Sequence, residues 1–424
     1  MRVIKRALGV LGVLICVAVI LLVWRNFRDE DAHPSAVADF AQEEFIARGA
    51  YLARVGHCAG CHTARGGAPY AGGYGVQTPF GTVYASNLTP DPETGIGDWT
   101  SDDFWRALHN GRSKDGRFLY PAFPYPNYTQ VTREDADAIY AYLRSLEPVH
   151  APNQAHSLRF PYRTQFALGV WRALYFAPGV YEPDDAQSDE WNRGAYLVKG
   201  FGHCSACHAG RNTLGASHEQ LDGGPLPVQG WYAPSLQSAR EAGVAHWEPE
   251  RIVALLRDGV TAGASVIGPM AEVVHGSTQY YSEADLNAMA AYLKTLPMDD
   301  PPPANFDPVR RSHYARGERI YADHCADCHG EQGEGVRGMY PALADNRAVT
   351  LDTPTNVVSA VLRGGFPPTT AGNPRPFGMP PYATLLSDED IAAVVSYIRN
   401  AWGNQASSVT AWEVQRHGRG VRGR

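Results

Sequence analysis

Residues 202–208 read Gly-His-Cys-Ser-Ala-Cys-His and are the middle copy of a Cys-x-x-Cys-His motif that occurs three times in the chain. The other copies lie at residues 58–62 and 325–329. This motif is the attachment signature of c-type haem: two thiols bond the vinyl groups of the porphyrin, and the histidine binds the iron. One helical turn between the cysteines puts both thiols on the same face. The predicted haem-binding residues are Cys58, Cys61, His62, Cys204, Cys207, His208, Cys325, Cys328 and His329.

Two other chemistries use paired cysteines. A single pair could be a redox dithiol or half of a zinc site, since structural zinc usually takes four Cys or His ligands. No second Cys-x-x-Cys pair lies near enough in sequence to complete any of the three sites, and a histidine follows every pair. Six of the 7 cysteines fall in these motifs. The pattern therefore favours covalent haem over zinc or disulfide chemistry and predicts three haem c groups.

Length and composition are consistent with several small domains. A chain of 424 residues fits about three domains of roughly 100 residues after an N-terminal segment. The 43 glycines and 31 prolines indicate loop-rich domains with thin cores, which a large apolar macrocycle at each centre would fill. The net charge of −7 gives no basic character, so nucleic acid is not an expected partner.

The N-terminal residues 1–30 predict a membrane anchor. An unbroken apolar run from Ala7 to Trp24 rises about 27 Å as a helix, enough to cross the hydrocarbon of a bilayer. The run ends in Leu-Leu-Val-Trp-Arg-Asn rather than in small residues, which favours an uncleaved anchor over a removed signal peptide. The basic residues before the run favour a cytoplasmic N-terminus. The remaining chain would then face the periplasm from the inner membrane.

The repeat extends beyond the haem motif. A short helix with Arg-Gly at its centre precedes each motif, and glycine inside a helix costs about 1 kcal/mol relative to alanine, which suggests close helix contact. The last helix of each unit opens with a capping-box-like pattern at Thr132, Ser282 or Ser387. We expect the tyrosine ten residues after each cap to pack on the early glycine. The glycines are Gly49, Gly194 and Gly317, and the tyrosines are Tyr142, Tyr292 and Tyr397. Middle helices are predicted to end at the C-cap glycines Gly111, Gly259 and Gly364.

These repeats divide the chain. The connector between the first two units is too apolar for a flexible tether and is expected to pack on both neighbours. The basic tail after Trp412 is expected to be disordered or to contact acidic lipid or a partner. The predicted segments are a membrane anchor (1–30), haem domain I (40–148), a connector (149–187), haem domain II (188–298), a Pro-rich linker (299–309), haem domain III (310–403) and a basic tail (404–424).

The distal iron ligands follow from the scarce methionines. A thioether opposite histidine stabilises ferrous iron and gives a high-potential carrier. Met270 and Met379 lie in loops between the middle and last helices and are the predicted ligands, with Met339 a weaker rival to Met379. In the first unit Phe123 stands where a methionine is expected, and His109 is the nearest substitute although it matches an arginine position elsewhere. The iron at His62 is therefore expected to be five-coordinate, water-bound, or bound by a residue that the sequence does not identify.

Several further stretches carry a family resemblance. The Arg-Gly-Ala-Tyr-Leu segments lead into the haem motifs, and residues 91–97, 115–122, 190–196, 270–274 and 371–376 follow the same family pattern. Over about residues 45–403 the chain resembles the tri-haem cytochrome c subunits of membrane-bound periplasmic dehydrogenases of Gram-negative bacteria. The resemblance implies a mainly α fold, with three tandem class-I cytochrome c domains after one N-terminal transmembrane helix.

The resemblance also implies a function. Such a subunit accepts electrons from a quinone-, flavin- or molybdenum-dependent dehydrogenase subunit, with a small third subunit in some complexes, and passes them from haem to haem to ubiquinone or another respiratory acceptor. It is not an enzyme on its own. Because Phe123 replaces the methionine usual in the alcohol and gluconate branches, the chain looks more like the branch that accompanies molybdenum hydroxylases.

Two other functions are compatible with the motifs. An open distal face in the first unit would suit a haem enzyme that reduces peroxide or binds a small gas, although no clear distal acid or base is present in the sequence. A partner-free electron shuttle is the other alternative, and the predicted anchor disfavours it.

Overall fold

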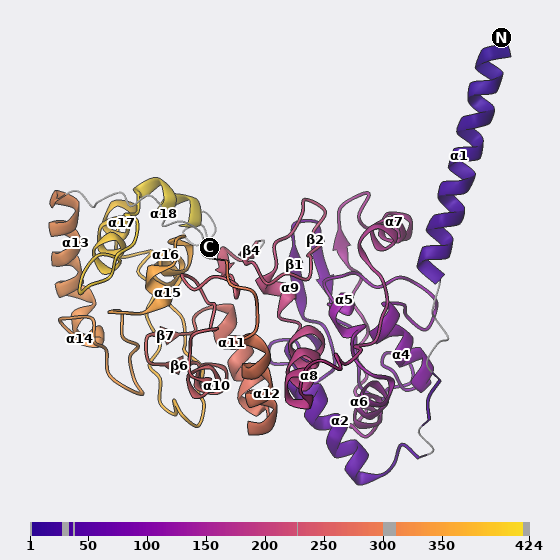
Figure 1. The fold of residues 1–424 in the computed structure, drawn as a ribbon, viewed down its shortest axis with the longest axis horizontal. Helices are drawn as coiled ribbons and strands as arrows, with labels where there is room; N and C mark the ends of the chain where they lie inside the picture. Colours follow the sequence, from indigo (N-terminus) through magenta and orange to yellow (C-terminus); the bar gives the residue numbers. More distant parts are fainter. Residues whose placement is uncertain (1, 28–33, 37–38, 227, 300–310, 419–424) are drawn as a thin grey trace.

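The computed structural model describes residues 2–27, 34–36, 39–226, 228–299 and 311–418. In these residues the chain is mainly helical and forms three similar units in a row, with a long N-terminal helix projecting from one end (Figure 1). Unit one contains α2 (Glu43–Val55), α3 (Cys58–His62), β1 (Gly75–Thr78), β2 (Gly81–Tyr84), α4 (Ser101–Asn110), α5 (Tyr125–Tyr128) and α6 (Arg133–Arg144).

The other units repeat this order of elements. Unit two contains α8 (Asp189–Tyr196), η1 (Leu197–Phe201), α9 (Ser205–His208), β4 (Gly224–Leu226), β5 (Trp231–Ala233), α10 (Pro249–Asp258), β6 (Val260–Thr261), β7 (Ala264–Ser265), α11 (Pro269–Gly276), η2 (Thr278–Tyr280) and α12 (Glu283–Leu293). Unit three contains α13 (Arg311–His324), α14 (Ala326–His329), α15 (Arg347–Thr350), α16 (Thr355–Arg363) and α17 (Asp388–Ile398). Outside the units lie α1 (Arg2–Phe27), β3 (Ser157–Leu158), α7 (Gln165–Tyr175) and α18 (Ala411–Gly418).

The first and last helices of each unit cross at a glycine, as the sequence predicts. A Cβ built at Gly49 would lie 1.9 Å from the carbonyl oxygen of Ala138 and 2.9 Å from the Cβ of Tyr142. The equivalent glycines in the other two units face the equivalent carbonyl and tyrosine in the same way. No side chain fits at these crossings, which explains why glycine occupies the centre of each first helix despite its low helix propensity.

The helix ends also follow the predicted signals. The middle helices α4, α10 and α16 end at their C-cap glycines, each with a positive φ, which glycine adopts at little cost. Each last helix begins at a side-chain cap, in which the cap hydroxyl accepts a hydrogen bond from the backbone amide of the residue three positions later. These caps are Thr132, Ser282 and Ser387.

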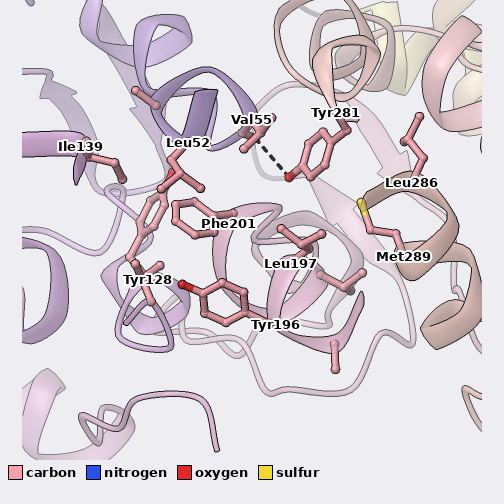
Figure 2. Packing of buried hydrophobic residues seen from close by; sticks show 14 of the residues in the cluster. Leu52, Val55, Tyr128, Ile139, Tyr196, Leu197, Phe201, Tyr281, Leu286 and Met289 are labelled. Atoms are coloured by element: carbon pink, nitrogen blue, oxygen red, sulfur yellow. Dashed lines mark hydrogen bonds between the residues drawn. The ribbon is translucent and has the colours of Figure 1, made fainter. Parts of the chain in front are cut away.

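The three units do not each have a separate hydrophobic core. Buried residues of units one and two form one continuous cluster, in which Leu52 and Ile139 of unit one pack with Leu197, Phe201 and Met289 of unit two (Figure 2). Unit three has a cluster of its own around α16 and α17. The first two units therefore fold as one body, and the third is docked against it.

Polar contacts attach unit three to unit two. The Oδ1 of Asn356 on α16 accepts a hydrogen bond from the backbone amide of Tyr232 at 2.9 Å, and its Nδ2 donates to the Tyr232 backbone carbonyl at 2.8 Å. The side chain therefore pairs with β5 as the backbone of a third strand would. Arg347 donates to the Gly243 carbonyl at 2.7 Å. The predicted Pro-rich linker between these units lies, from residue 300 onward, outside the described residues.

The connector packs on both neighbours, as expected. Its strand β3 extends the antiparallel β1–β2 pair of unit one, and Trp171 of α7 donates to the Leu214 carbonyl of unit two at 3.0 Å. The basic tail after Trp412 was expected to be disordered, and for residues 413–418 this is wrong, because residues 411–418 are helical. They form α18, because Val409 and Val414 are buried against α16 and α17.

The N-terminal segment predicted as a transmembrane anchor forms the helix α1. Its end is fixed to α7, where Arg25 donates to the Ala173 carbonyl at 2.9 Å and Asn26 to the Gly169 carbonyl at 3.0 Å. Among the residues described by the structure, none of the helices combines the length and apolar character needed to span a membrane.

Candidate haem sites

Each Cys-x-x-Cys-His motif occupies a short helical turn, and the same contact orients its histidine in all three units. The Nδ1 of His62 lies 2.7 Å from the Ser86 carbonyl oxygen. His208 makes the same contact with Pro234 at 2.7 Å, and His329 with Pro341 at 2.9 Å. A carbonyl only accepts, so Nδ1 carries the proton and Nε2 keeps a free lone pair. This hydrogen bond fixes the tautomer and ring orientation that a metal-binding histidine needs.

The three histidines are also kept neutral. Burial lowers the pKa of His62, His208 and His329, and outweighs the opposing effect of the carbonyl hydrogen bond. A neutral imidazole is the form that binds iron. Protonation state and orientation therefore both suit the predicted role of these residues.

A glycine in each unit lets the loop after the motif cross over the backbone of the motif's histidine. Gly223 donates its amide to the His208 carbonyl at 2.8 Å, and Gly72 and Gly335 do the same to His62 and His329. At Gly223 the φ is +80°, and a Cβ would lie 2.6 Å from the Ser235 nitrogen. Both facts require glycine at this position.

Sequence reasoning missed these supporting residues. Their signal is present in retrospect: the accepting carbonyl belongs to Ser86, Pro234 or Pro341, and a leucine follows two positions later in each case. Such a short pattern becomes recognisable only after the contact is known. The carbonyl comes from a loop 24 residues after His62 but only 12 after His329.

The paired cysteines are free thiols that are partly accessible to solvent. Burial raises the pKa of the first thiol in each motif, at Cys58, Cys204 and Cys325, to about 12. A raised pKa keeps these thiols protonated in the absence of a bound group. In the part of the chain that the structure describes, no three His, Cys, Asp or Glu side chains are grouped so as to hold a metal ion.

Taken together, the motifs fit covalent haem. Each offers two thiols one helical turn apart, followed by a histidine whose Nε2 is free and whose Nδ1 is fixed by the backbone. Haem attachment needs these groups and no others from the motif.

The two predicted distal methionines were expected in loops between the middle and last helices, and the structure places only Met379 in such a loop. Met270 is in the first turn of α11, after Gly268 and Pro269. Met379 pairs with Gly365 in an isolated antiparallel bridge and packs on the core of unit three. Iron binding by these two methionines remains a prediction.

The backbone register supports the equivalence of Phe123 and Met270. In unit one the residue four positions before Phe123 donates to the carbonyl of the C-cap Gly111 at 2.8 Å. In unit two the residue four positions before Met270 donates to the C-cap Gly259 at 2.9 Å. Phe123 stacks on Tyr128 with ring centroids 5.4 Å apart.

His109 is packed in the interior of unit one. It is 2% exposed, its Nδ1 lies 2.9 Å from the Thr129 carbonyl, and its ring stacks on Trp105 with centroids 4.4 Å apart. The Nδ1–carbonyl contact also occurs at the three motif histidines, so it does not distinguish a core histidine from an iron ligand, and the candidacy of His109 stays a prediction.

The repeated helical scaffold and the oriented histidines define a c-type cytochrome. The cytochrome c family model matches residues 46–147 and 314–402, which lie in units one and three. The chain is 39% identical over 394 residues to the cytochrome c subunit of an alcohol dehydrogenase (quinone) from Gluconacetobacter polyoxogenes, covering 88% of this chain and 84% of that protein. It is 37% identical over 397 residues to the gluconate 2-dehydrogenase cytochrome c subunit of Pantoea cypripedii, covering 89% and 90%. The chain belongs to this family of dehydrogenase cytochrome c subunits and is an electron-transfer subunit.

A third relative bears on the branch within the family. A nicotinate dehydrogenase subunit from Pseudomonas putida is 37% identical over 414 residues, which cover 96% of this chain and 34% of that protein. Identities of 39%, 37% and 37% to the alcohol, gluconate and nicotinate proteins do not separate the branches. Assignment to the molybdenum-dependent branch therefore stays a prediction that rests on Phe123.

Proposed function

We propose that this chain binds three haem c groups, accepts electrons from the catalytic subunit of a dehydrogenase, and relays them to ubiquinone or another respiratory acceptor. The observation that carries the proposal is the threefold repeat of one arrangement: two thiols, a histidine with free Nε2, and a backbone carbonyl on its Nδ1. Haem held by these groups supplies a one-electron iron couple.

The protein's own residues then have four tasks. The cysteines would attach the ring, and His62, His208 and His329 would present Nε2 to the iron. Their Nδ1–H groups donate to the backbone carbonyls of Ser86, Pro234 and Pro341. Met270 and Met379 are proposed as the distal ligands. The buried aromatic residues around each motif exclude water, which limits the reorganisation that accompanies a change of charge. The proposed haem domains span residues 40–148, 188–298 and 310–403.

We propose that the chain acts at the periplasmic face of the inner membrane. Support comes from α1, on which Val13, Ile20 and Trp24 face outward with 64%, 65% and 56% exposure. Helix α7, to which α1 is attached, exposes Phe166 and Leu174. Alkaline carbonate extraction of membranes that contain the full chain or a variant lacking residues 1–27 tests this placement; equal release of both proteins would contradict it.

The haem assignment is tested by counting haem in the full chain, produced in a host with intact cytochrome c maturation. The pyridine haemochrome of the unaltered protein should give three covalent haems per chain. Replacing Cys204 and Cys207 by alanine should leave two, whereas Cys16→Ala, a matched thiol outside the motifs, should leave three. Zinc in place of haem, or an unchanged count in the double variant, would refute the proposal.

Electron acceptance is tested with the complex. Co-expression with a catalytic subunit encoded nearby should give a co-purifying complex in which substrate reduces the haems. Absence of a large partner after purification in mild detergent would favour a partner-free shuttle.

A second function is favoured by one observation, the replacement of the expected methionine by Phe123 in unit one. Without a thioether ligand, the iron at His62 could bind a small gas or react with peroxide. Carbon monoxide binding to one haem of the reduced protein, with measurable peroxide turnover, would support this function. Low-spin spectra of all three haems would exclude it.

A further inference from the structure

Units one and two are joined by a pair of crossed hydrogen bonds. Tyr51 on α2 of unit one donates to the Asp285 carboxylate of unit two at 2.6 Å. Tyr196 on α8 of unit two donates to the Asp135 carboxylate of unit one, also at 2.6 Å. The two tyrosines occupy the same position in their repeats, three residues after the arginine of Arg-Gly, so the contact is reciprocal.

The crossed contacts replace part of a helix cap. In a capping box the carboxylate at the third helical position accepts the backbone amide of the cap residue. In α17 of unit three this box is closed, with Asp390 accepting from the amide and hydroxyl of Ser387. In α12 the Ser282 amide instead donates to the Tyr51 hydroxyl at 3.1 Å, and this hydroxyl donates onward to Asp285.

The equivalent insertion occurs at α6. The Thr132 amide donates to the Tyr196 hydroxyl at 3.1 Å, and that hydroxyl donates to Asp135. Each tyrosine thus completes the cap of the other unit's last helix. In unit three the matching position holds an exposed arginine, Arg319, and no such exchange occurs there in the described residues.

The aspartates are anchored on their own side as well. Arg193 binds Asp285 through Nε and Nη2 at 2.8 and 2.9 Å, and Arg48 binds Asp135 at 2.6 Å. Despite burial, which acts in the opposite direction, the bonds from Arg193 and Tyr51 lower the pKa of Asp285. The acceptor therefore stays ionised, and a hydrogen bond to an ionised acceptor is stronger than a neutral one.

Further contacts between units one and two lie next to the haem motifs. Tyr281 of unit two donates to the Val55 carbonyl at 3.2 Å, just before the motif of unit one. In return, Tyr128 of unit one packs edge-on against His203, just before the motif of unit two, with centroids 5.7 Å apart. Figure 2 shows the Tyr281 contact in the shared core.

We infer that Tyr51 and Tyr196 are positioning residues that clamp units one and two into a pseudo-twofold pair, so that the haems proposed at residues 58–62 and 204–208 are direct partners in electron exchange. The inference rests on the proposed haem binding. Unit three, which lacks the crossed tyrosine and has its own core, is the separately docked member of the relay.

A protein-level experiment tests the clamp. A protease site is placed in the exposed connector segment 184–187 of the full-length holoprotein, and the cleaved chain is diluted. Wild-type fragments should stay associated. Tyr51→Phe with Tyr196→Phe should weaken association by about tenfold per hydroxyl, or about a hundredfold together. Tyr140→Phe is the matched control, because its hydroxyl donates at 2.6 Å to Trp99 within unit one.

A potentiometric titration of the uncleaved protein tests positioning of the haems. Reduction of one haem lowers the midpoint potential of a close neighbour, so the titration of the paired haems is spread out. The double tyrosine variant should narrow this spread, whereas Tyr140→Phe should not. Each single tyrosine variant should give half of the double variant's effect on the logarithm of the fragment dissociation constant. If the double variant folds poorly, the two single variants still test the clamp.

The outcomes are separable. Fragments of the double variant that bind as tightly as those of Tyr140→Phe, or an unchanged spread of potentials, would overturn the clamp. A wild-type chain with fewer than three haems would instead contradict the proposed function, and fragment association would still report on the clamp.

Discussion

The close helix crossing in unit three allows a substitution effect to be worked out in detail. A Cβ built at Gly317 would lie 2.2 Å from the Ala393 carbonyl oxygen and 2.7 Å from the Cβ of Tyr397. Unstrained contacts of this kind are about 3.5 Å, so Gly317→Ala must push α13 and α17 apart by about 1 Å. The helices then lose close packing over much of their contact.

Two effects of the new methyl group oppose each other. Alanine favours the helix by about 1 kcal/mol relative to glycine. Overpacking of a rigid contact costs about 3 kcal/mol, the upper end of the usual range, because the nearest atom belongs to the backbone and cannot rotate away. The free energy of unfolding of unit three should therefore fall by about 2 kcal/mol.

Guanidinium chloride unfolding of the holoprotein, followed by circular dichroism and haem absorption, measures this change. Because unit three has its own hydrophobic cluster, Gly317→Ala should give an unfolding transition at lower denaturant concentration than in the wild type. This transition should account for only part of the change in circular dichroism and haem absorption. Gly49→Ala should instead destabilise units one and two together, since they share a core. Gly179→Ala is the control, because nothing lies within 4 Å of a Cβ built there. A Gly317→Ala curve that coincides with wild type or shifts to higher denaturant would refute the reasoning.

Three further predictions concern the haem sites and their surroundings. Gly223→Ala, at φ +80°, should lose the haem of unit two, giving two haems per chain by pyridine haemochrome. Phe123→Met should abolish carbon monoxide binding at the first haem, and Met270→Ala should create it at the second; identical spectra would contradict both ligand assignments. Burial lowers the pKa of His203 from 6.5 to about 4, so the folded state binds fewer protons than the unfolded state between these values. Stability should therefore fall by about 3 kcal/mol as pH decreases from 6.5 to 4, and His203→Gln should remove that part of the acid sensitivity in unfolding measured against pH.

Local sequence patterns were sufficient for the helices and for the haem motifs. Caps such as Ser387, C-cap glycines such as Gly364, and the spacing of cysteines and histidine all act within a few residues, so their physical meaning can be read directly. The glycine–tyrosine crossing was predictable for a different reason. Three copies in one register revealed a contact that a single copy, such as Gly49 with Tyr142, would have left ambiguous.

The sequence by itself determined the three candidate haem-attachment motifs, the first, middle and last helices of each unit, and the place where the first and last helices meet. Only the tertiary structure decided which carbonyl fixes each histidine, that the tail contains a packed helix, and that units one and two share one core. The physical reason is distance along the chain. The Tyr51–Asp285 bond joins residues 234 positions apart, and no local propensity specifies such a pair; it forms because two similar units bury their apolar surfaces against each other, which brings each tyrosine to the other's helix cap.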